Sequence, residues 1–257
     1  TMDNLGAIIG PLLAIVLVKA VGTRWAIGLS VIPGLLAAVA VIYAIRRSET
    51  PRRSERPPLR IRIRPVLAGR LRGLFGGITA FELGNCAATL LILRATELLA
   101  PGRSSEAATT AALFLYVTYN VAATLTSLPA GRYSDRTGTT HVLALGVAAF
   151  AVAYVGFAAE SSGWLVMLPW FVLAGVGIGC VETAEHAAVA THAPSELRGS
   201  AFGLLAGVQS LGNLAASGVA GVLWSALGPG WAFGYLAAWM TVALVAFSFS
   251  ARHESVS

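Results

Sequence analysis

Several side chains that can do chemistry stand inside long apolar stretches of the sequence, where charged groups are rare. Glu82 and Asn85 are three residues apart in one such stretch, so a continuous helix would place both on one face. Because burying a charge in a bilayer is costly, an ionisable residue there is a functional candidate. We therefore expect Glu82 to act in proton coupling or in substrate binding.

Polar residues recur at comparable depths in other apolar stretches. Tyr116, Tyr119 and Asn120 cluster in one stretch, and Gln209 and Asn213 share a helical face in another. Hydrogen bonding between packed helices explains these amides and tyrosines equally well. The full set of candidates for a substrate cavity or for proton coupling is Asp3, Glu82, Asn85, Tyr116, Tyr119, Asn120, Gln209 and Asn213.

A third group of candidate residues lies in an apolar stretch, near the end that is expected to face the cytoplasm. Glu182, Glu185 and His186 follow the spacing i, i+3, i+4, which puts them on one side of a helix. One interpretation is a proton relay, since buried carboxyl and imidazole groups can titrate near neutrality. The other, which we favour, is an ion-pair latch with Arg132 or Arg136 that holds one conformation closed.

These residues need membrane-spanning helices to position them. Apolar residues make up 56% of the 257 residues and charged residues 12%, whereas a soluble domain carries about 25% charged residues. A run of about 20 apolar residues crosses a bilayer, and no strict alternation suggests barrel strands. The sequence therefore predicts an all-α polytopic membrane bundle. Its eight expected spans are residues 4–20, 24–45, 73–94, 109–130, 140–158, 163–187, 200–224 and 231–250.

The basic residues predict the orientation. Residues 46–72 hold ten arginines, and the loops on that side bring the total to fourteen, against four basic residues on the other side. By the positive-inside rule the richer side is cytoplasmic, which places both ends of this chain in the cytoplasm. The Arg- and Pro-rich stretch 46–65 lacks aromatic residues for stacking on bases. We thus interpret it as a loop near anionic lipid head groups rather than a nucleic-acid arm. On the opposite side, Arg94 and Glu97 are expected to form a snorkelling pair.

An internal repeat links the two ends of the chain. Residues 5–28 align without a gap with residues 211–234, and ten of the 24 positions are identical. The identities include the glycine pair Gly22 and Gly228 and a tryptophan pair three positions later. In this alignment Asp3 corresponds to Gln209, although Asp3 has an alternative role as the partner of a basic residue on another span.

The repeat relates the first expected span to the seventh, an even separation, so the two copies run in the same direction. Two parallel six-span halves form a known transporter plan. The offset then predicts about 134 further residues and four further spans before residue 1. On this plan 1–46 are the last two spans of the N-terminal half, 47–71 a cytoplasmic linker, and 72–257 the C-terminal six-helix half.

The short stretch "GRYSDRTG" (131–138) resembles the G-x-x-x-D-R-x-G loop of the major facilitator superfamily. The resemblance implies a cytoplasmic gating loop in which Gly131 and Gly138 permit a tight turn. Asp135 would face the N-terminus of a helix of the other half, where a carboxylate is favoured, and Arg132 and Arg136 complete the motif. The basic residues that usually follow the last glycine are missing here.

Two further stretches are similar to the same family. "GAIIGPLLA" (6–14) resembles its G-x-x-x-G-P motif, in which Gly6 and Gly10 permit close helix approach and Pro11 a bend. That motif is associated with exporters that exchange substrate for protons, but its final double glycine is absent here. "VETAEHAAVATHAPSELRGSAFG" (181–203) resembles the end of span ten, the following loop and the start of span eleven.

Together these features predict a secondary transporter of the cell membrane, namely a proton-coupled exporter of small organic molecules. An uptake symporter for a small metabolite is the alternative. An intramembrane enzyme or an ATP-driven pump is disfavoured, because the sequence lacks G-x-S-x-G, H-E-x-x-H and a G-K-[ST] phosphate loop. We expect no cofactor or metal beyond an ion gradient, no nucleic-acid partner, and a monomer in the bilayer.

Overall fold

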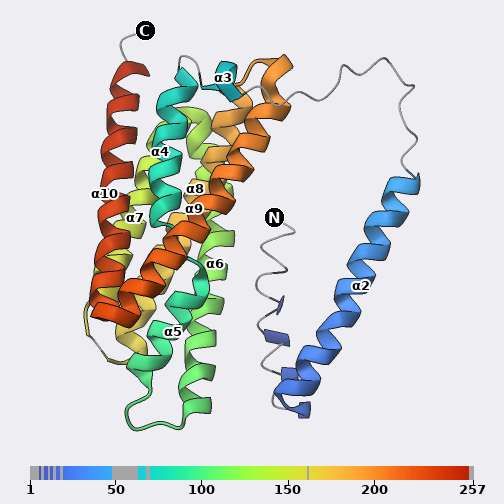
Figure 1. Ribbon diagram of the computed structural model, residues 1–257, viewed down its shortest axis with the longest axis vertical. Coiled ribbons are helices and arrows are strands. Elements are labelled where there is room, and N and C mark those ends of the chain that lie inside the picture. Colours follow the sequence, from blue (N-terminus) through green and yellow to red (C-terminus); the bar gives the residue numbers. More distant parts are fainter. Residues whose placement is uncertain are drawn as a thin grey trace. The chain divides into compact units, whose positions relative to one another are not determined.

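The structure is a computed structural model that describes residues 6, 9–10, 12–13, 16–17, 20–47, 63–67, 70–160 and 162–254. Regular structure in these residues is entirely helical (Figure 1). The elements are α2 (Thr23–Arg47), α3 (Ile63–Val66), α4 (Arg70–Gly84), α5 (Ala88–Leu99), α6 (Ser105–Thr137), α7 (Thr139–Ala158), α8 (Trp164–His192), η1 (Ser195–Leu197), α9 (Arg198–Leu227) and α10 (Pro229–Glu254).

Within the described residues, six helical segments are long and apolar enough to cross a membrane. They correspond to the third to eighth spans expected from the sequence, with α4 and α5 together making the segment Leu71–Leu99. The second expected span is α2, whose apolar part is the shorter Gly28–Ala44. Most of the first expected span, 4–20, lies outside the described residues.

The chain divides into two compact units, one within Ile8–Arg60 and the other mainly within Ile61–Ser257. The division falls inside the expected linker 47–71. The larger unit holds all six membrane-capable segments, and the remaining description concerns that unit.

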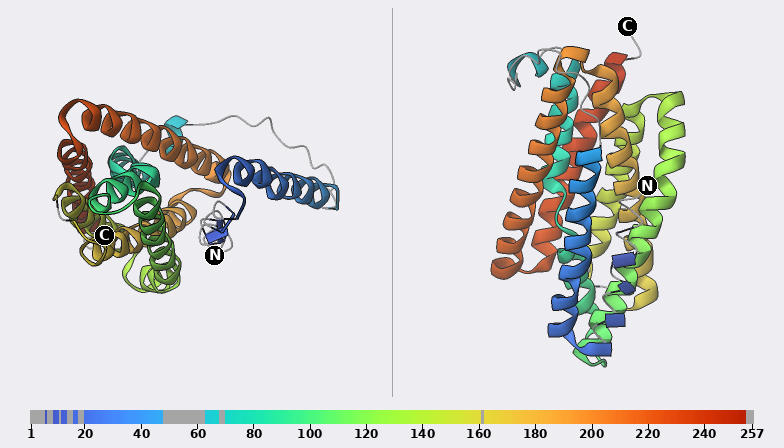
Figure 2. Two further views of the ribbon diagram at one scale, coloured as in Figure 1. Left: turned by 90° about the horizontal axis from the view of Figure 1, so that it is seen from below. Right: turned by 90° about the vertical axis from the view of Figure 1, so that its right-hand side faces the viewer.

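Helix α8 lies at the centre of the larger unit. It packs against α6 and α7 and also contacts α4 and α9, while α10 packs on α7, α4 and α9. The views in Figures 1 and 2 show these helices running side by side as a bundle. The helix pair α4 and α9 therefore lies on the α8 core, which is the arrangement that positions the site described below.

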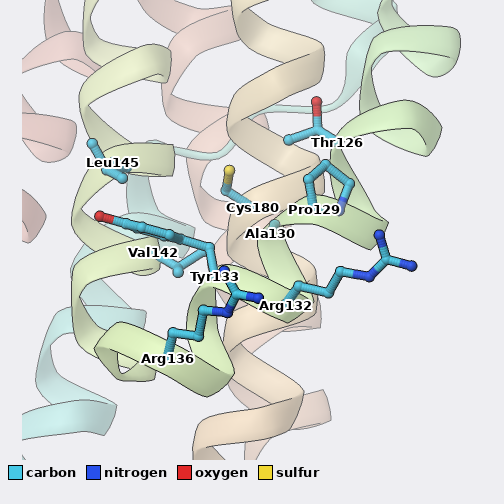
Figure 3. A pocket seen from close by; sticks show the side chains of 9 residues that line it. All are labelled: Thr126, Pro129, Ala130, Arg132, Tyr133, Arg136, Val142, Leu145 and Cys180. Carbon is cyan, nitrogen blue, oxygen red and sulfur yellow. The ribbon is translucent and has the colours of Figure 1, made fainter.

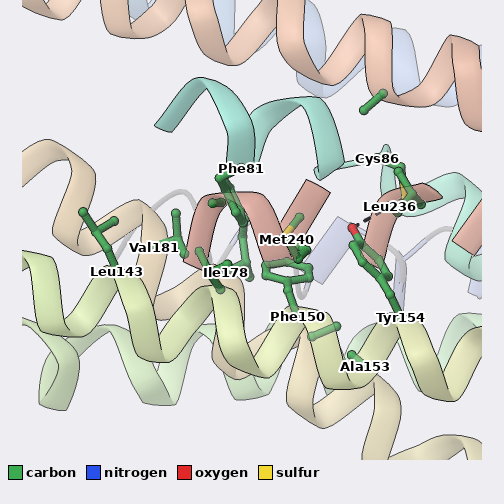
Figure 4. Close-up of a cluster of buried hydrophobic side chains, with 14 of the residues drawn as sticks. Phe81, Cys86, Leu143, Phe150, Ala153, Tyr154, Ile178, Val181, Leu236 and Met240 are labelled. Atoms are coloured by element: carbon green, nitrogen blue, oxygen red, sulfur yellow. Dashed lines mark hydrogen bonds between the residues drawn. The ribbon is translucent and has the colours of Figure 1, made fainter. Parts of the chain in front are cut away.

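Aromatic and aliphatic side chains from four helices fill the core (Figure 4). Phe81 of α4 meets Phe150 of α7 edge to face, with ring centroids 5.5 Å apart. Tyr154 adjoins Phe150, and its hydroxyl lies 3.8 Å from the Cys86 sulfur. Inside a bilayer helices gain little from the hydrophobic effect, so close packing of this kind holds the bundle together.

Glycines on α8 let two neighbouring backbones approach closely. A Cβ added at Gly175 would overlap the Tyr119 carbonyl oxygen of α6, and one at Gly179 would lie 2.5 Å from the Ala123 carbonyl oxygen. The two glycines are four residues apart, which is the small-xxx-small spacing of membrane helix pairs. We predicted this spacing at Gly6 and Gly10 but not at Gly175 and Gly179.

The glycine pair of the internal repeat adopts similar backbone geometry in both copies. Gly22 has φ of 81° and Gly228 φ of 103°, a region that favours glycine. The amide of Gly228 also donates to the Leu223 and Trp224 carbonyls, which closes the end of α9. The identity of these two residues in the alignment thus corresponds to a shared turn.

Arg94 occupies a different environment from the one expected. Its side chain is only 4% exposed, and it donates from Nε to the Phe157 carbonyl at 3.0 Å and from Nη2 to the Ala159 carbonyl at 3.2 Å. Glu97 lies 4.0 Å away. The expected pairing of Arg94 with Glu97 is therefore present, but the guanidinium is buried and caps the C-terminal end of α7 rather than snorkelling to solvent.

Candidate functional site

The membrane segment Leu71–Leu99 is interrupted in its middle. Helix α4 ends at Gly84 and α5 begins at Ala88, so residues 85–87 are not helical. The expectation of a continuous helix here was wrong, but Glu82 and Asn85 still lie on one side, where their side chains hydrogen-bond to each other. Unwound backbone at membrane depth must find hydrogen-bond partners in the protein.

Helix α9 supplies those partners. The Asn213 Nδ2 donates to the Asn85 carbonyl at 2.8 Å, and the Ala87 amide donates to the Ser217 Oγ at 2.9 Å. Asn213 and Ser217 are one helical turn apart, so a single face of α9 bridges both sides of the break. Ser217 was not among our candidates, since a serine in an apolar run gives no signal without knowledge of its neighbour.

Beside the break lies a cavity of about 440 Å³ between α4, α8 and α9. Its walls bring together residues that the sequence analysis had placed in two separate groups. The lining residues are Phe81, Glu82, Asn85, Ile178, Glu182, Glu185, His186, Gln209, Ser210 and Asn213. Four of them belong to the expected substrate-cavity set, and three belong to the expected latch.

Two glutamates of this cavity are almost completely buried. Glu82 is 3% exposed, and its Oε2 accepts a hydrogen bond from Asn85 Nδ2 at 3.1 Å. Glu185 is 0% exposed, and its Oε2 accepts from Gln209 Nε2 at 3.0 Å. The Glu185 Oε1 has no hydrogen-bond partner. A buried carboxylate oxygen without a donor is costly, so this group needs a further partner when the site is occupied.

The α8 residues next to Glu185 complete that side of the cavity. His186 lies with Nδ1 2.8 Å from the Glu182 carbonyl oxygen, one turn earlier on the same helix. Its ring stacks on Phe202 of α9, with centroids 6.2 Å apart. Glu182 and His186 thus both line the cavity wall between α8 and α9.

Helices α4 and α9 approach each other closely, which brings the side-chain amides of Gln209 and Asn213 to the carboxyl groups of the cavity. A Cβ added at Gly212 would lie 2.5 Å from the Glu82 Cβ and 3.1 Å from the Glu82 carbonyl carbon. Gly212 stands between Gln209 and Asn213 in the sequence, so the contact holds both amides at the cavity. A larger residue at position 212 would separate the two helices.

The arginines of the expected latch lie at another place. Arg132 and Arg136 line a second cavity of about 580 Å³, together with Tyr133 of the same helix and Cys180 of α8 (Figure 3). The hydrogen bond of Glu185 goes to Gln209 of α9 and not to either arginine.

The motif 131–138 is mostly helical. Residues Gly131 to Thr137, with Asp135 exposed, form the last two turns of α6, and only Gly138 makes the turn into α7, with φ of 93°. The expected tight loop is therefore shorter than predicted, and Gly131 is not part of it. A positive φ explains why a glycine stands at position 138.

Three further candidates on α6 do not line the cavity beside the break. The rings of Tyr116 and Tyr119 stack with centroids 5.6 Å apart, and Asn120 Nδ2 donates to the Tyr116 carbonyl at 2.9 Å. Asp3 and Pro11 lie outside the described residues, so the first candidate and the Gly6–Gly10–Pro11 motif stay predictions.

Comparison with known proteins decides the family. The model of the Major Facilitator Superfamily matches residues 99–256, which is more than half of the chain. The chain belongs to the major facilitator superfamily. Membership in the major facilitator superfamily agrees with the six membrane-capable segments, and it makes the cavity beside the helix break the natural candidate for a transport site.

Two individual proteins are similar to this member of the major facilitator superfamily. An uncharacterized MFS-type transporter of Methanocaldococcus jannaschii is 32% identical over 145 residues, which cover 56% of this chain and 36% of the relative. The crystal structure of the nucleoside transporter NupG (D323A mutant) matches with a TM-score of 0.63 at 16% identity, over 96% of this chain and 65% of that chain. The chain thus spans about a third of the first protein and under two thirds of the second.

Proposed function

We propose that this chain is part of a proton-coupled exporter of small organic molecules that works by alternating access in the cell membrane. The observation that carries the proposal is the pair of buried carboxyl groups, Glu82 and Glu185, at the interruption of a membrane helix. Discontinuous helices and ionisable residues near mid-membrane are the features from which transporters build their substrate and proton sites.

The proposed direction of transport, export, is based on a sequence motif. The stretch with Gly6, Gly10 and Pro11 is similar to the motif associated with exporters. On this proposal the protein needs an ion gradient and no bound cofactor, acts as a monomer, and keeps both ends of this chain in the cytoplasm. An uptake symporter for a small metabolite is the alternative, and the two differ in the relative direction of substrate and proton.

A vesicle assay separates them. The protein made in full from its native gene is reconstituted in inside-out vesicles that are acidic inside and contain a pH-sensitive dye. An exporter moves added substrate inward while protons leave, so each transported substrate from a panel of small molecules should collapse the pH gradient. Substrate that accumulates together with protons, in the same direction, would show a symporter instead.

Two variants make the assay specific to the site. Glu82→Gln keeps the size of the side chain but removes its acid–base function, and we expect at least about a tenfold loss of proton-coupled flux, typical for loss of a proton-transfer group. Glu106→Gln is the matched control, because Glu106 is exposed in the first turn of α6 and is not a cavity residue. Full coupled flux in Glu82→Gln would contradict the proposed role of this carboxylate.

A further inference from the structure

The cavity beside the helix break is rich in acidic side chains. Glu82, Glu182 and Glu185 all line it, and among its described lining residues none is lysine or arginine. His186 is the one basic type there, and its Nδ1 already lies 2.8 Å from the Glu182 carbonyl oxygen. In surroundings of low dielectric constant, charges of one sign attract an opposite charge more strongly than they do in water.

The amides of the cavity also present acceptors. Asn85 donates from Nδ2 to Glu82, Gln209 from Nε2 to Glu185, and Asn213 from Nδ2 to the Asn85 carbonyl. Each amide must turn its nitrogen toward these oxygens, because two acceptors facing one another would repel. Each of these amides therefore has one N–H engaged within the site, and its oxygen can accept a hydrogen bond from a ligand.

Glu185 has a buried side-chain oxygen for which the described residues provide no hydrogen-bond partner. Its side chain is completely buried, it lines the cavity, and its Oε1 has no hydrogen-bond partner. Leaving a buried acceptor without a partner costs about 1–3 kcal/mol, and more for a charged group. A positively charged ligand beside Glu185 would relieve that cost.

From these three features we infer that the cavity is a site for organic cations, that is, small molecules with an ammonium or similar cationic centre attached to an apolar body. This inference rests on the proposed transport function and names the substrate class of the same site. Phe81 and Ile178 supply apolar wall, and the volume of about 440 Å³ lies within the usual size of small-molecule pockets. Three of the described lining residues are acidic and only His186 is of a basic type, so the lining favours a cation over an anion.

A pair of probes that share size and shape tests the charge preference directly. Tetraphenylphosphonium is a cation and tetraphenylborate is an anion of nearly the same form. Binding of each to the detergent-solubilised full-length protein is measured by equilibrium dialysis. We expect the cation to bind at least about tenfold more tightly than the anion, and equal or tighter binding of the anion would overturn the inference.

Variants of the cavity glutamates then test whether the preference for the cation arises at this cavity. Glu185→Gln should weaken binding of the cation at least about tenfold while leaving the anion unchanged, and Glu82→Gln should act in the same direction. Glu106→Gln, an exposed glutamate of α6, should bind both probes as the unmodified protein does. Unchanged cation binding in both cavity variants would overturn the assignment to this site. If Glu185→Gln does not elute as a monodisperse peak, Glu82→Gln and the probe pair still decide the question.

The outcome is separable from that of the transport assay. Selective binding of the cation without any proton-coupled flux would mean that the proposed coupling is wrong while the site chemistry stands. Proton-coupled flux of neutral or anionic substrates, without cation selectivity in dialysis, would leave the transport proposal intact and refute the substrate class.

Discussion

Single side chains of α9 hold together the helix that carries Glu82. Asn213 and Ser217 hydrogen-bond to backbone groups on either side of the interruption, and Gly212 packs on the Glu82 backbone. The two hydrogen bonds go to main-chain atoms of the unwound residues 85–87, and the glycine contact is with Glu82 itself. The geometry of the carboxylate site is thus fixed by residues that carry no charge.

Ser217 offers a test of this bridging. Ser217→Ala removes the acceptor of the partly buried Ala87 amide, and an unsatisfied donor costs up to about 1–3 kcal/mol when it is fully buried. We therefore expect a lower thermal unfolding midpoint in detergent, together with reduced transport. Ser225→Ala is the matched control, since Ser225 lies on the same helix and bonds only to its own turn at Gly221. Equal unfolding midpoints for the two variants would show that the bridge does not stabilise the break.

At the scale of elements, glycine decides which helices meet. Helix α8 presents Gly175 and Gly179 to α6 and Gly177 to α7, where the Gly146 carbonyl oxygen would lie 2.9 Å from an added Cβ. Helix α9 uses Gly212 in the same manner toward α4. Close backbone contact of this kind replaces the hydrophobic driving force that is weak between helices in lipid.

The α6–α8 contact can be tested with one methyl group. Gly179→Ala places a Cβ against the Ala123 carbonyl oxygen, and we expect overpacking to destabilise the protein by about 1–3 kcal/mol. The unfolding midpoint measured by differential scanning fluorimetry should fall accordingly. Gly221→Ala on α9 is the control, because nothing lies within 4 Å of its added Cβ, and alanine is the better helix former. A stabilised Gly179→Ala protein would refute the close approach of α6 and α8.

At the scale of the whole molecule, we propose that the described bundle holds one wall of a transport pathway. The cavity beside the break is lined by α4, α8 and α9 alone, and the internal repeat predicts a second, parallel half that would face it. The two proteins compared above are longer than this chain, which spans 36% of one and 65% of the other. On this proposal the complete pathway needs both halves.

The mass of the protein made from its native gene tests this plan. The repeat offset predicts about 134 additional residues, and at the mean residue mass of this chain the intact protein should weigh about 40 kDa. Mass spectrometry of the purified protein measures this directly. A mass of 26.5 kDa, that of the 257 residues alone, would instead indicate an eight-span protein that needs a partner chain to close its cavity.

The sequence by itself determined the class of protein and much of its plan. Long apolar runs favour membrane helices, and the third to eighth expected spans correspond to the six described segments that are long and apolar enough to cross a membrane. The repeat pairing Gly22 with Gly228 was also visible, and both residues make a turn at positive φ. These features depend on local composition and on residues whose backbone preference is strong, and both can be read from one sequence.

Tertiary structure decided how the polar residues are grouped. The interruption after Gly84 exists because α9 brings Asn213 and Ser217 to the unwound backbone, which no local pattern near Glu82 reveals. Likewise, Glu185 was expected near an arginine but lies beside Gln209 on another helix. Spacing along one helix predicts only which residues share a face, whereas the partner that this face meets is set by the packing of glycines and aromatic rings across the whole bundle.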